Sequence, residues 1–419
     1  MKLSAFGKRL TSDSGILNLM TDLGNALAGD RKKYMLGGGN PALIPEIAEV
    51  WRAEAERLLA DQERFDRALG QYDTPQGRPR FMRAVAGLLR REFGWDVGPQ
   101  NIGITNGSQS AFFMLFALLA GPAEDGSHRR VHFPLMPEYI GYCDQPLRPT
   151  DFSATLPIID QLSEHEHKYR VDFDNLELDE SIAAVCVSRP TNPTGNVITD
   201  HEIAQLAEKC RALEIPLMID NAYGTPFPDI IFVDAKPHWD HNTILALSLS
   251  KIGLPALRTG IIVANEQIIR ALSATNAVLA LANGSMGQVL TEQLFESGRI
   301  LELSRDIVRP YYREKRDQAL EWVHRTFDGR FAYSVHKSEG SLFLWIWFPD
   351  LPSGTSTLYS RLQERDVVIV PGKYFAFGEH AGWKHADECI RVNYALNPSD
   401  VQRGIEIIAE EVEEMWSGT

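Results

Sequence analysis

The sequence predicts an α/β protein, with a mostly parallel sheet that carries helices on both faces and a smaller α+β domain joined to it. Short apolar runs alternate with helical stretches between residues 102 and 281. These runs are apolar throughout, which is typical of parallel strands that are buried on both faces. From about residue 300 a long helical stretch is followed by alternating strands, and this change indicates the second domain.

Composition and charge exclude several classes of protein. A length of 419 residues leaves room for two or three domains. Hydrophobic residues make up 44% of the chain and charged residues 23%, which excludes a largely disordered protein. The 42 Lys and Arg residues against 56 Asp and Glu residues give a net charge of −14. A chain this acidic lacks the field that draws proteins to nucleic acid or anionic lipid, so neither is an expected partner.

The four cysteines indicate a reducing compartment. No two of them lie closer than 24 positions apart, so we expect neither a zinc site built from closely spaced cysteines nor a disulfide framework. The longest apolar run, residues 111–120, is about half a membrane span, and no signal peptide is visible. The histidines at positions 165, 167, 380 and 385 fall in polar stretches and are expected to be solvated. We therefore expect a cytoplasmic protein without a metal site.

The first elements are expected to be an arm and two helices. Residues 1–30 are poorly periodic and predict an arm with one short helix. Residues 43–69 repeat apolar positions at near-helical spacing, and residues 80–93 predict a second helix that ends at Gly94. We divide the chain into the arm (1–30), a small α+β domain (31–45 and 300–419) and a large α/β domain (46–299).

The remaining elements follow in order along the chain. The expected strands of the large domain are residues 102–105, 130–133, 183–187, 216–219, 243–247 and 260–264. The expected helices among them are residues 108–119, 138–143, 200–213 and 266–281. In the small domain we expect helices at 301–327 and 399–416 and strands at 331–335, 342–348 and 367–370. Right-handed crossovers would bring the carboxyl ends of the parallel strands to one edge, where ligands bind in such sheets.

A lysine follows one of these strands directly. Lys251 lies in a turn between Ser248, Ser250 and Arg258. Partial desolvation and a nearby cation both lower the pKa of a lysine and free its amine as a nucleophile. Two hydroxyls and an arginine in one loop also suit a phosphate group. The alternative is a surface turn with one solvated lysine.

Asp220 ends another buried strand, and Tyr223 follows it by three residues. A carboxylate at the end of a buried strand needs a partner, because an unpaired buried charge costs several kcal/mol. A protonated heterocyclic nitrogen is one such partner, and Tyr223 is placed to donate to an oxygen on the same ring. Taken alone, Asp220 is better explained as a cap of the next helix or as a metal ligand.

Two turns after strands complete the set. Two prolines and a glycine in residues 188–195 fix a turn that presents Asn192 rigidly. Residues 105–111 join a strand to an apolar helix, and the free N–H groups at a helix N-terminus bind anions. An ordinary Asn-Pro turn and a plain N-cap at Ser108 are the alternatives.

Together and in this order, the motifs resemble the class I and II aminotransferases, which are pyridoxal-phosphate enzymes of fold type I. The resemblance runs from about residue 34 to the C-terminus. It is carried by residues 36–41 (Leu-Gly-Gly-Gly-Asn-Pro), 106–112 (Asn-Gly-Ser-Gln-Ser-Ala-Phe), 137–142 (Pro-Glu-Tyr-Ile-Gly-Tyr), 188–195 (Ser-Arg-Pro-Thr-Asn-Pro-Thr-Gly) and 220–224 (Asp-Asn-Ala-Tyr-Gly).

The resemblance implies roles around the ring of the cofactor, pyridoxal 5′-phosphate, which the large domain would bind. Lys251 would bond to the cofactor and then act as a general base. Asp220 would pair with the ring nitrogen and keep it protonated, so that the ring acts as an electron sink. Tyr223 and Asn192 would bind the phenolic oxygen of the ring, and Tyr139 would stack on its face.

The resemblance also implies how the phosphate and the substrate are bound. The expected phosphate ligands are Ser248, Ser250, Arg258 and the backbone at Gly107, Ser108 and Gln109. Tyr72 matches a tyrosine that reaches the phosphate of the neighbouring subunit, which implies a homodimer with shared active sites. Arg391 matches the arginine that binds the substrate α-carboxylate in a fork, a geometry for which Lys is a poor substitute. Gly39 and Asn192 would lie at the same substrate site.

The implied reaction is transfer of the amino group of L-valine, or a similar small apolar amino acid, to pyruvate, giving the 2-oxo acid and L-alanine, as in amino-acid biosynthesis. No second arginine for a side-chain carboxylate is identifiable, and residues 279–286 are small and neutral, which disfavours aspartate and glutamate as substrates. A lyase or decarboxylase on the same scaffold is one alternative. A ligand-sensing regulator is another, although only about 30 residues precede the fold.

Overall fold

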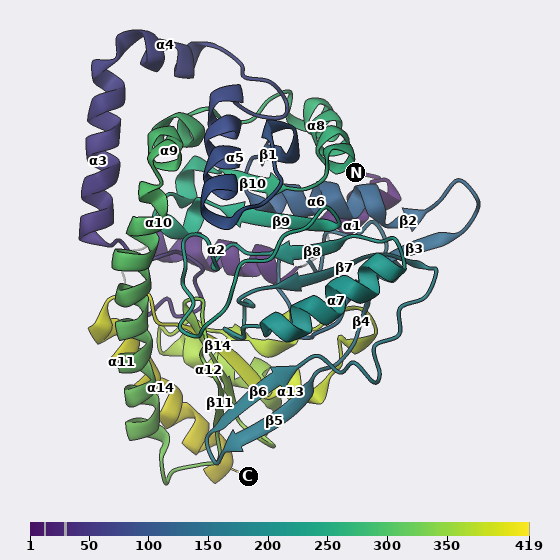
Figure 1. Ribbon diagram of the computed structural model, residues 1–419. Helices are drawn as coiled ribbons and strands as arrows, with labels where there is room; N and C mark the ends of the chain where they lie inside the picture. The colour runs from purple at the N-terminus through teal and green to yellow at the C-terminus, as the bar shows by residue number, and fades with distance from the viewer. Residues whose placement is uncertain (12–13, 29–31, 419) are drawn as a thin grey trace.

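The computed structural model describes residues 1–11, 14–28 and 32–418, and it contains two sheets (Figure 1). The larger sheet has eight strands in the order β1-β10-β9-β8-β7-β3-β2, with β4 paired to β3. Its strands are β1 (Ile102–Thr105), β2 (Gly121–Pro122), β3 (His128–Phe133), β4 (Phe152–Ala154), β7 (Ile182–Ser188), β8 (Leu217–Asp220), β9 (Thr243–Ser248) and β10 (Gly260–Val263).

The predicted parallel core of this sheet is confirmed. Strands β4, β3, β7, β8 and β9 pair in parallel. Strand β10 runs antiparallel to both β9 and β1, and β2 runs antiparallel to β3. The carboxyl ends of β7, β8 and β9 therefore meet at one edge, as the crossover rule requires.

The larger sheet is covered by helices on both faces, because its strands send alternate side chains into two cores. Val185 and Val187 of β7 belong to one core with residues of α5 and α7. Ala184 and Cys186 belong to the other core with residues of α6 and α8. The helices beside this sheet are α5 (Pro79–Phe93), α6 (Ser108–Leu119), α7 (Asp200–Ala212), α8 (Glu266–Ala280) and α9 (Met286–Ser297).

The second sheet has six strands in the order β13-β14-β12-β11-β6-β5. They are β5 (Ile158–Ser163), β6 (Glu166–Arg170), β11 (Ser334–His336), β12 (Phe343–Trp347), β13 (Val370–Pro371) and β14 (Cys389–Asn393). Its helices are α10 (Arg299–Leu303), α11 (Arg309–Phe327), α12 (Gly354–Glu364), α13 (Lys384–Asp387) and α14 (Pro398–Ser417).

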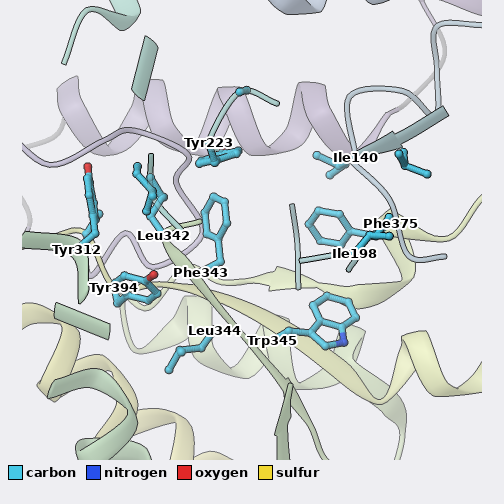
Figure 2. Packing of buried hydrophobic residues seen from close by; sticks show 14 of the residues in the cluster. Ile140, Ile198, Tyr223, Tyr312, Leu342, Phe343, Leu344, Trp345, Phe375 and Tyr394 are labelled. Atoms are coloured by element: carbon cyan, nitrogen blue, oxygen red, sulfur yellow. The ribbon is translucent and has the colours of Figure 1, made fainter. Parts of the chain in front are cut away.

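One strand pair of the second sheet comes from an unexpected part of the chain. The predicted large domain (46–299) includes residues 158–170, yet β6 pairs in parallel with β11 of the second sheet. Figure 2 shows how closely the two sheets join: Tyr223, after β8, faces Phe343 of β12. Their ring centroids lie 6.0 Å apart at 70°. The two sheets thus share one hydrophobic core, which agrees with the lack of a flexible linker in the sequence.

Several predicted helices differ in the structure. The arm contains two helices, α1 (Ala5–Leu10) and α2 (Gly15–Ala28), instead of one; residues 12–13 and 29–31 lie outside the described residues. The helix predicted at 43–69 is divided into α3 (Pro45–Ala60) and α4 (Gln62–Gly70), because the Asp61 side chain accepts the N–H of Arg64 and caps a new helix.

Two further predictions of regular structure need correction. Residues 138–143 form turns and no helix, and the Tyr142 N–H donates to the Tyr139 carbonyl at 2.9 Å. The helix predicted at 301–327 is made of α10 and α11, joined by a π-helical turn at Ser304–Val308. Pro310 has no N–H to continue the α-helical ladder at that point. No helix among the described residues is long and apolar enough to cross a bilayer.

The turn after β7 requires a glycine at position 195, and substitution of this glycine tests that requirement. Gly195 has φ +71°, and a Cβ there would lie 2.7 Å from the Gly340 carbonyl oxygen. Gly329 has a similar φ of +74° but open space around it. We expect Gly329→Ala to cost about 1 kcal/mol for the backbone conformation alone, and Gly195→Ala to cost about 2 kcal/mol more because the backbones must separate. Denaturant unfolding measures both, and equal losses would contradict the close approach.

Candidate active site

The carboxyl ends of β7, β8 and β9 open into a cavity of about 590 Å³. Of the fourteen site residues predicted from the sequence, twelve line it: Gly39, Ser108, Gln109, Tyr139, Asn192, Asp220, Tyr223, Ser248, Ser250, Lys251, Arg258 and Arg391. Gly107 and Tyr72 are not among the lining residues. The cavity thus collects side chains from both sheets, since Arg391 lies on β14 of the second one.

Lys251 lies in the short turn that follows β9, as predicted. Its amine donates to the Gly39 carbonyl at 2.7 Å and lies 5.1 Å from the centre of the Tyr223 ring. Burial, together with the charges of Arg391 and Arg258, lowers the pKa of Lys251 to about 8 against the opposing effect of Asp220. About a tenth of the amine is therefore neutral at pH 7 and available as a nucleophile or base.

Asp220 ends β8 and is held by two donors. The Tyr142 hydroxyl donates to one carboxylate oxygen at 2.6 Å, and the Ala222 N–H donates to the other at 3.1 Å. Burial raises the pKa of Asp220, whereas these donors and Lys251 lower it. The carboxylate is thus oriented for a cationic partner in the cavity. Tyr142 was missed as a site residue, although its spacing of three residues from Tyr139 in one motif is a usable signal.

Arg391 crosses from the second sheet and is fully buried. Its two terminal nitrogens donate to the Asn192 side-chain oxygen at 2.7 Å and to the Gly37 carbonyl at 2.6 Å. Burial lowers the pKa of Arg391 to about 10. Its Nε has no hydrogen-bond partner, and no carboxylate among the described residues pairs with the guanidinium. Because a buried cation without an anion is costly, this arginine favours a ligand carboxylate.

A cradle for a second anion lies at the N-terminus of α6. Gly107 caps this twelve-residue helix with φ +90°, and a Cβ there would lie 2.2 Å from the guanidinium of Arg258. The first-turn N–H groups at Ser108 and Gln109 have no partner within the helix, and they lie beside this cation. The Gln109 side-chain Oε1 is buried without a partner. The free N–H groups at the N-terminus of α6 and the guanidinium of Arg258, in one cavity with Lys251, fit a phosphorylated cofactor.

Within one chain, the apolar wall of the cavity comes from a segment other than the neutral stretch 279–286. Residues 279–286 do not line this cavity, and Leu279 and Leu281 are more than half exposed. The apolar wall comes instead from α2 and the turn after β3: Ile16, Leu19, Met20 and Ile140. The spacing of the three α2 residues, at i, i+3 and i+4, is the signal that could have found them.

The charges of the cavity are few. Its charged lining residues, within the described part of the chain, are Asp220, Lys251, Arg258 and Arg391. We find no cluster of three or more His, Cys, Asp or Glu side chains that could hold a metal ion in residues 1–11, 14–28 and 32–418. The predicted solvation of His167 and His385 was wrong, because His167 of β6 and His385 of α13 are both buried.

Comparisons with known proteins agree with this geometry. The family model for aminotransferase class I and II matches residues 32–408. The chain is 45% identical over 417 residues to the valine–pyruvate aminotransferase of Escherichia coli K12, covering 100% of this chain and 99% of that protein. A solved putative amino-acid aminotransferase from Psychrobacter arcticum superposes with TM-score 0.96 at 43% identity, covering both chains completely. A solved valine–pyruvate aminotransferase from Salmonella typhimurium superposes with TM-score 0.88 at 44% identity, covering 96% of this chain and 100% of that one.

The charges around Lys251 predict how the pKa of its amine changes when one of them is removed. A neighbouring positive charge disfavours protonation of Lys251, so removing the exposed cation in Arg258→Gln raises the pKa of the Lys251 amine from about 8 towards its usual value. NMR of ¹³C-methylated lysines in the protein without added ligand measures this, with Lys251→Ala assigning the resonance. A parent pKa near that of exposed lysines would contradict the account, as would no change in the variant.

Proposed function

The chain belongs to the class I and II aminotransferases, and from this premise we propose that it uses pyridoxal phosphate to move the amino group of L-valine, or a similar small apolar amino acid, to pyruvate. The observation that carries the proposal is the amine of Lys251 in one cavity with Asp220 and Arg391. The full-length identity to the Escherichia coli enzyme supports the choice of substrates.

The residues present fit the cofactor at each of its polar groups. Lys251 supplies the amine that holds it covalently, and Asp220 supplies the carboxylate for its ring nitrogen. The N-terminus of α6 with Ser108, Gln109, Ser248, Ser250 and Arg258 suits its phosphate. When bound, pyridoxal phosphate supplies an electron-withdrawing ring that stabilises negative charge on the α-carbon of the amino acid.

The protein's own groups then bind the substrate and move its proton. Arg391 holds the α-carboxylate through two parallel N–H donors, which fixes the orientation of the α-carbon. The neutral amine of Lys251 takes the proton from that carbon, and its lowered pKa keeps a neutral fraction present at pH 7. Asn192 is held by Arg391, so the substrate and cofactor sites share one hydrogen-bonded unit.

The apolar wall supports a hydrocarbon side chain on the substrate. Ile16, Leu19, Met20 and Ile140 provide it, and among the described lining residues Arg258 is the only arginine besides Arg391. With Arg258 at the phosphate cradle, a side-chain carboxylate would be buried without a cation, which disfavours aspartate and glutamate. Such a wall separates substrates that differ by one methylene by only about 1–3 kcal/mol, so several small amino acids are expected to react.

We also propose a homodimer with shared sites. Tyr72 is 83% exposed, outside the cavity of its own chain. Its segment is tied to the α8–α9 connection, since Asp73 accepts the Ser285 hydroxyl at 2.7 Å and the Pro75 carbonyl accepts the Asn283 side chain at 3.1 Å. That connection and its neighbourhood expose further large apolar side chains, at Leu69, Val278, Leu279 and Leu281. An exposed apolar group of this kind suits contact with a second subunit.

The role of Lys251 is tested by Lys251→Ala. The variant folds and binds pyridoxal phosphate, but the covalent bond is lost and alanine formation from L-valine and pyruvate falls by at least about 10³-fold. Mass spectrometry after borohydride reduction measures the bond. Lys315→Ala is the control, because Lys315 also has a lowered pKa but lies outside the cavity. Parental turnover in Lys251→Ala would refute the proposal.

The shared site is tested with mixed dimers of Tyr72→Phe and Lys251→Ala. If Tyr72 serves the neighbouring subunit, placing the two substitutions on different chains leaves one intact site. Placing both on one chain leaves a site whose cofactor binds about ten-fold more weakly, through loss of one hydrogen bond to a charged group. Cofactor titration of both dimers distinguishes the arrangements, and the reverse pattern would show that Tyr72 serves its own chain.

A further inference from the structure

A glutamate outside the cavity is joined to two of its walls. Glu138 has no exposed surface and does not line the cavity. One of its carboxylate oxygens accepts the Ser188 N–H at 2.7 Å. The other accepts the Ser188 hydroxyl at 2.6 Å and the Tyr139 N–H at 3.1 Å. No ion pair of Glu138 with a cation is found in the described part of the chain, so hydrogen bonds alone compensate its burial.

The two residues that Glu138 holds are both cavity residues. Tyr139 forms the wall assigned to the face of the cofactor ring, and Ser188 lines the cavity at the end of β7. Ser188 lies directly opposite Asp220 in the pairing of β7 with β8. It also begins the turn that carries Asn192. Glu138 therefore connects the ring-stacking wall to the strand ends that carry the two polar partners of the ring.

The backbone of Glu138 adds a link to the second sheet. Its N–H donates to the Phe375 carbonyl at 3.0 Å. The Phe375 ring lies 5.2 Å from the guanidinium carbon of Arg391. One residue thus touches the segments behind Tyr139, Asn192 and Arg391, although it touches neither the cavity nor the substrate site itself.

We propose that Glu138 is a positioning residue, which holds Tyr139 and the Ser188 end of the Asn192 turn at the spacing that the cofactor ring requires. The inference rests on the proposed function, because the ring is that of pyridoxal phosphate. Active sites depend on such supporting hydrogen bonds, since small misplacements of a binding group cost large factors in rate. Burial raises the pKa of Glu138 to about 8, and a proton taken up there can be shared with the Ser188 hydroxyl, so that bond survives in either protonation state.

The chain offers a matched control for this proposal. Glu202 in α7 is also buried, and it accepts the same pattern of donors: the Val171 N–H on one oxygen, and the Thr199 N–H and hydroxyl on the other. Neither Val171 nor Thr199 lines the cavity. Comparing Glu138→Gln with Glu202→Gln therefore separates the general effect of replacing a buried glutamate from the loss of positioning.

The test measures the bound cofactor as well as turnover. In Glu138→Gln the side-chain N–H₂ is a donor that faces the Tyr139 N–H, so the hydrogen bond to Tyr139 is lost. We therefore expect the bound cofactor to show a weaker visible circular dichroism band. We also expect the cofactor to bind about ten-fold more weakly and kcat to fall. Glu202→Gln should keep the parental band, affinity and kcat while its thermal stability falls by a similar amount. A parental band and affinity in Glu138→Gln would overturn the proposal, as would equal losses in both variants.

Two further measurements keep the outcomes distinct. If Glu138→Gln does not fold, Ser188→Ala removes only the hydroxyl, and we expect a smaller loss of the same circular dichroism band; no loss would overturn the proposal. If the parent protein itself shows no visible band with pyridoxal phosphate, the proposed function fails and this inference falls with it. If the parent protein shows the band and Glu138→Gln keeps the parental band and cofactor affinity, only the inference about Glu138 is overturned.

Discussion

The rest of the structure depends on two cations and one carboxylate that line a single cavity without forming an ion pair with one another: Arg391 is fully buried, and Lys251 and Asp220 are half-buried. Lys251 donates to a carbonyl, Arg391 donates to a carbonyl and an amide, and Asp220 accepts from a tyrosine and a backbone N–H. Each group is oriented: Arg391 and Asp220 are left able to bind ligand groups of opposite charge, and the Lys251 amine is left able to react. Unpaired charges in the cavity cost free energy when no ligand is bound. A bound cofactor and amino acid together offset this cost, because their charged groups pair with those of the protein.

The two sheets make this arrangement possible because neither holds all three groups. β8 and β9 carry Asp220 and the turn of Lys251, whereas β14 carries Arg391. The turn after β7 joins them: Asn192 accepts from Arg391, and Lys168 of β6 donates to Asn196 at 3.0 Å and pairs with Glu339. The unexpected strand pair β5–β6 thus ties the second sheet to the turn that spans the cavity.

Features that depend on residues close together in the chain could be predicted from the sequence. Strand ends followed by Lys251, Asp220 and Asn192 were recognisable because parallel strands must share an edge. The antiparallel direction of β10 was not, since apolar runs carry no direction. Tyr142 and Glu138 were missed because their function lies in contacts across the fold, with Asp220 and Ser188. The apolar wall from α2 was missed, because Ile16, Leu19 and Met20 lie far along the chain from the other segments of the cavity.

The most direct test of the account is the visible absorption spectrum of the protein with pyridoxal phosphate, recorded after separate additions of L-valine, L-alanine and L-aspartate. The account predicts a band that valine and alanine bleach, that the matching 2-oxo acid restores, and that aspartate leaves unchanged. Absence of the band after reconstitution would remove Lys251 from its role. A band that no amino acid bleaches would keep the cofactor and contradict transamination.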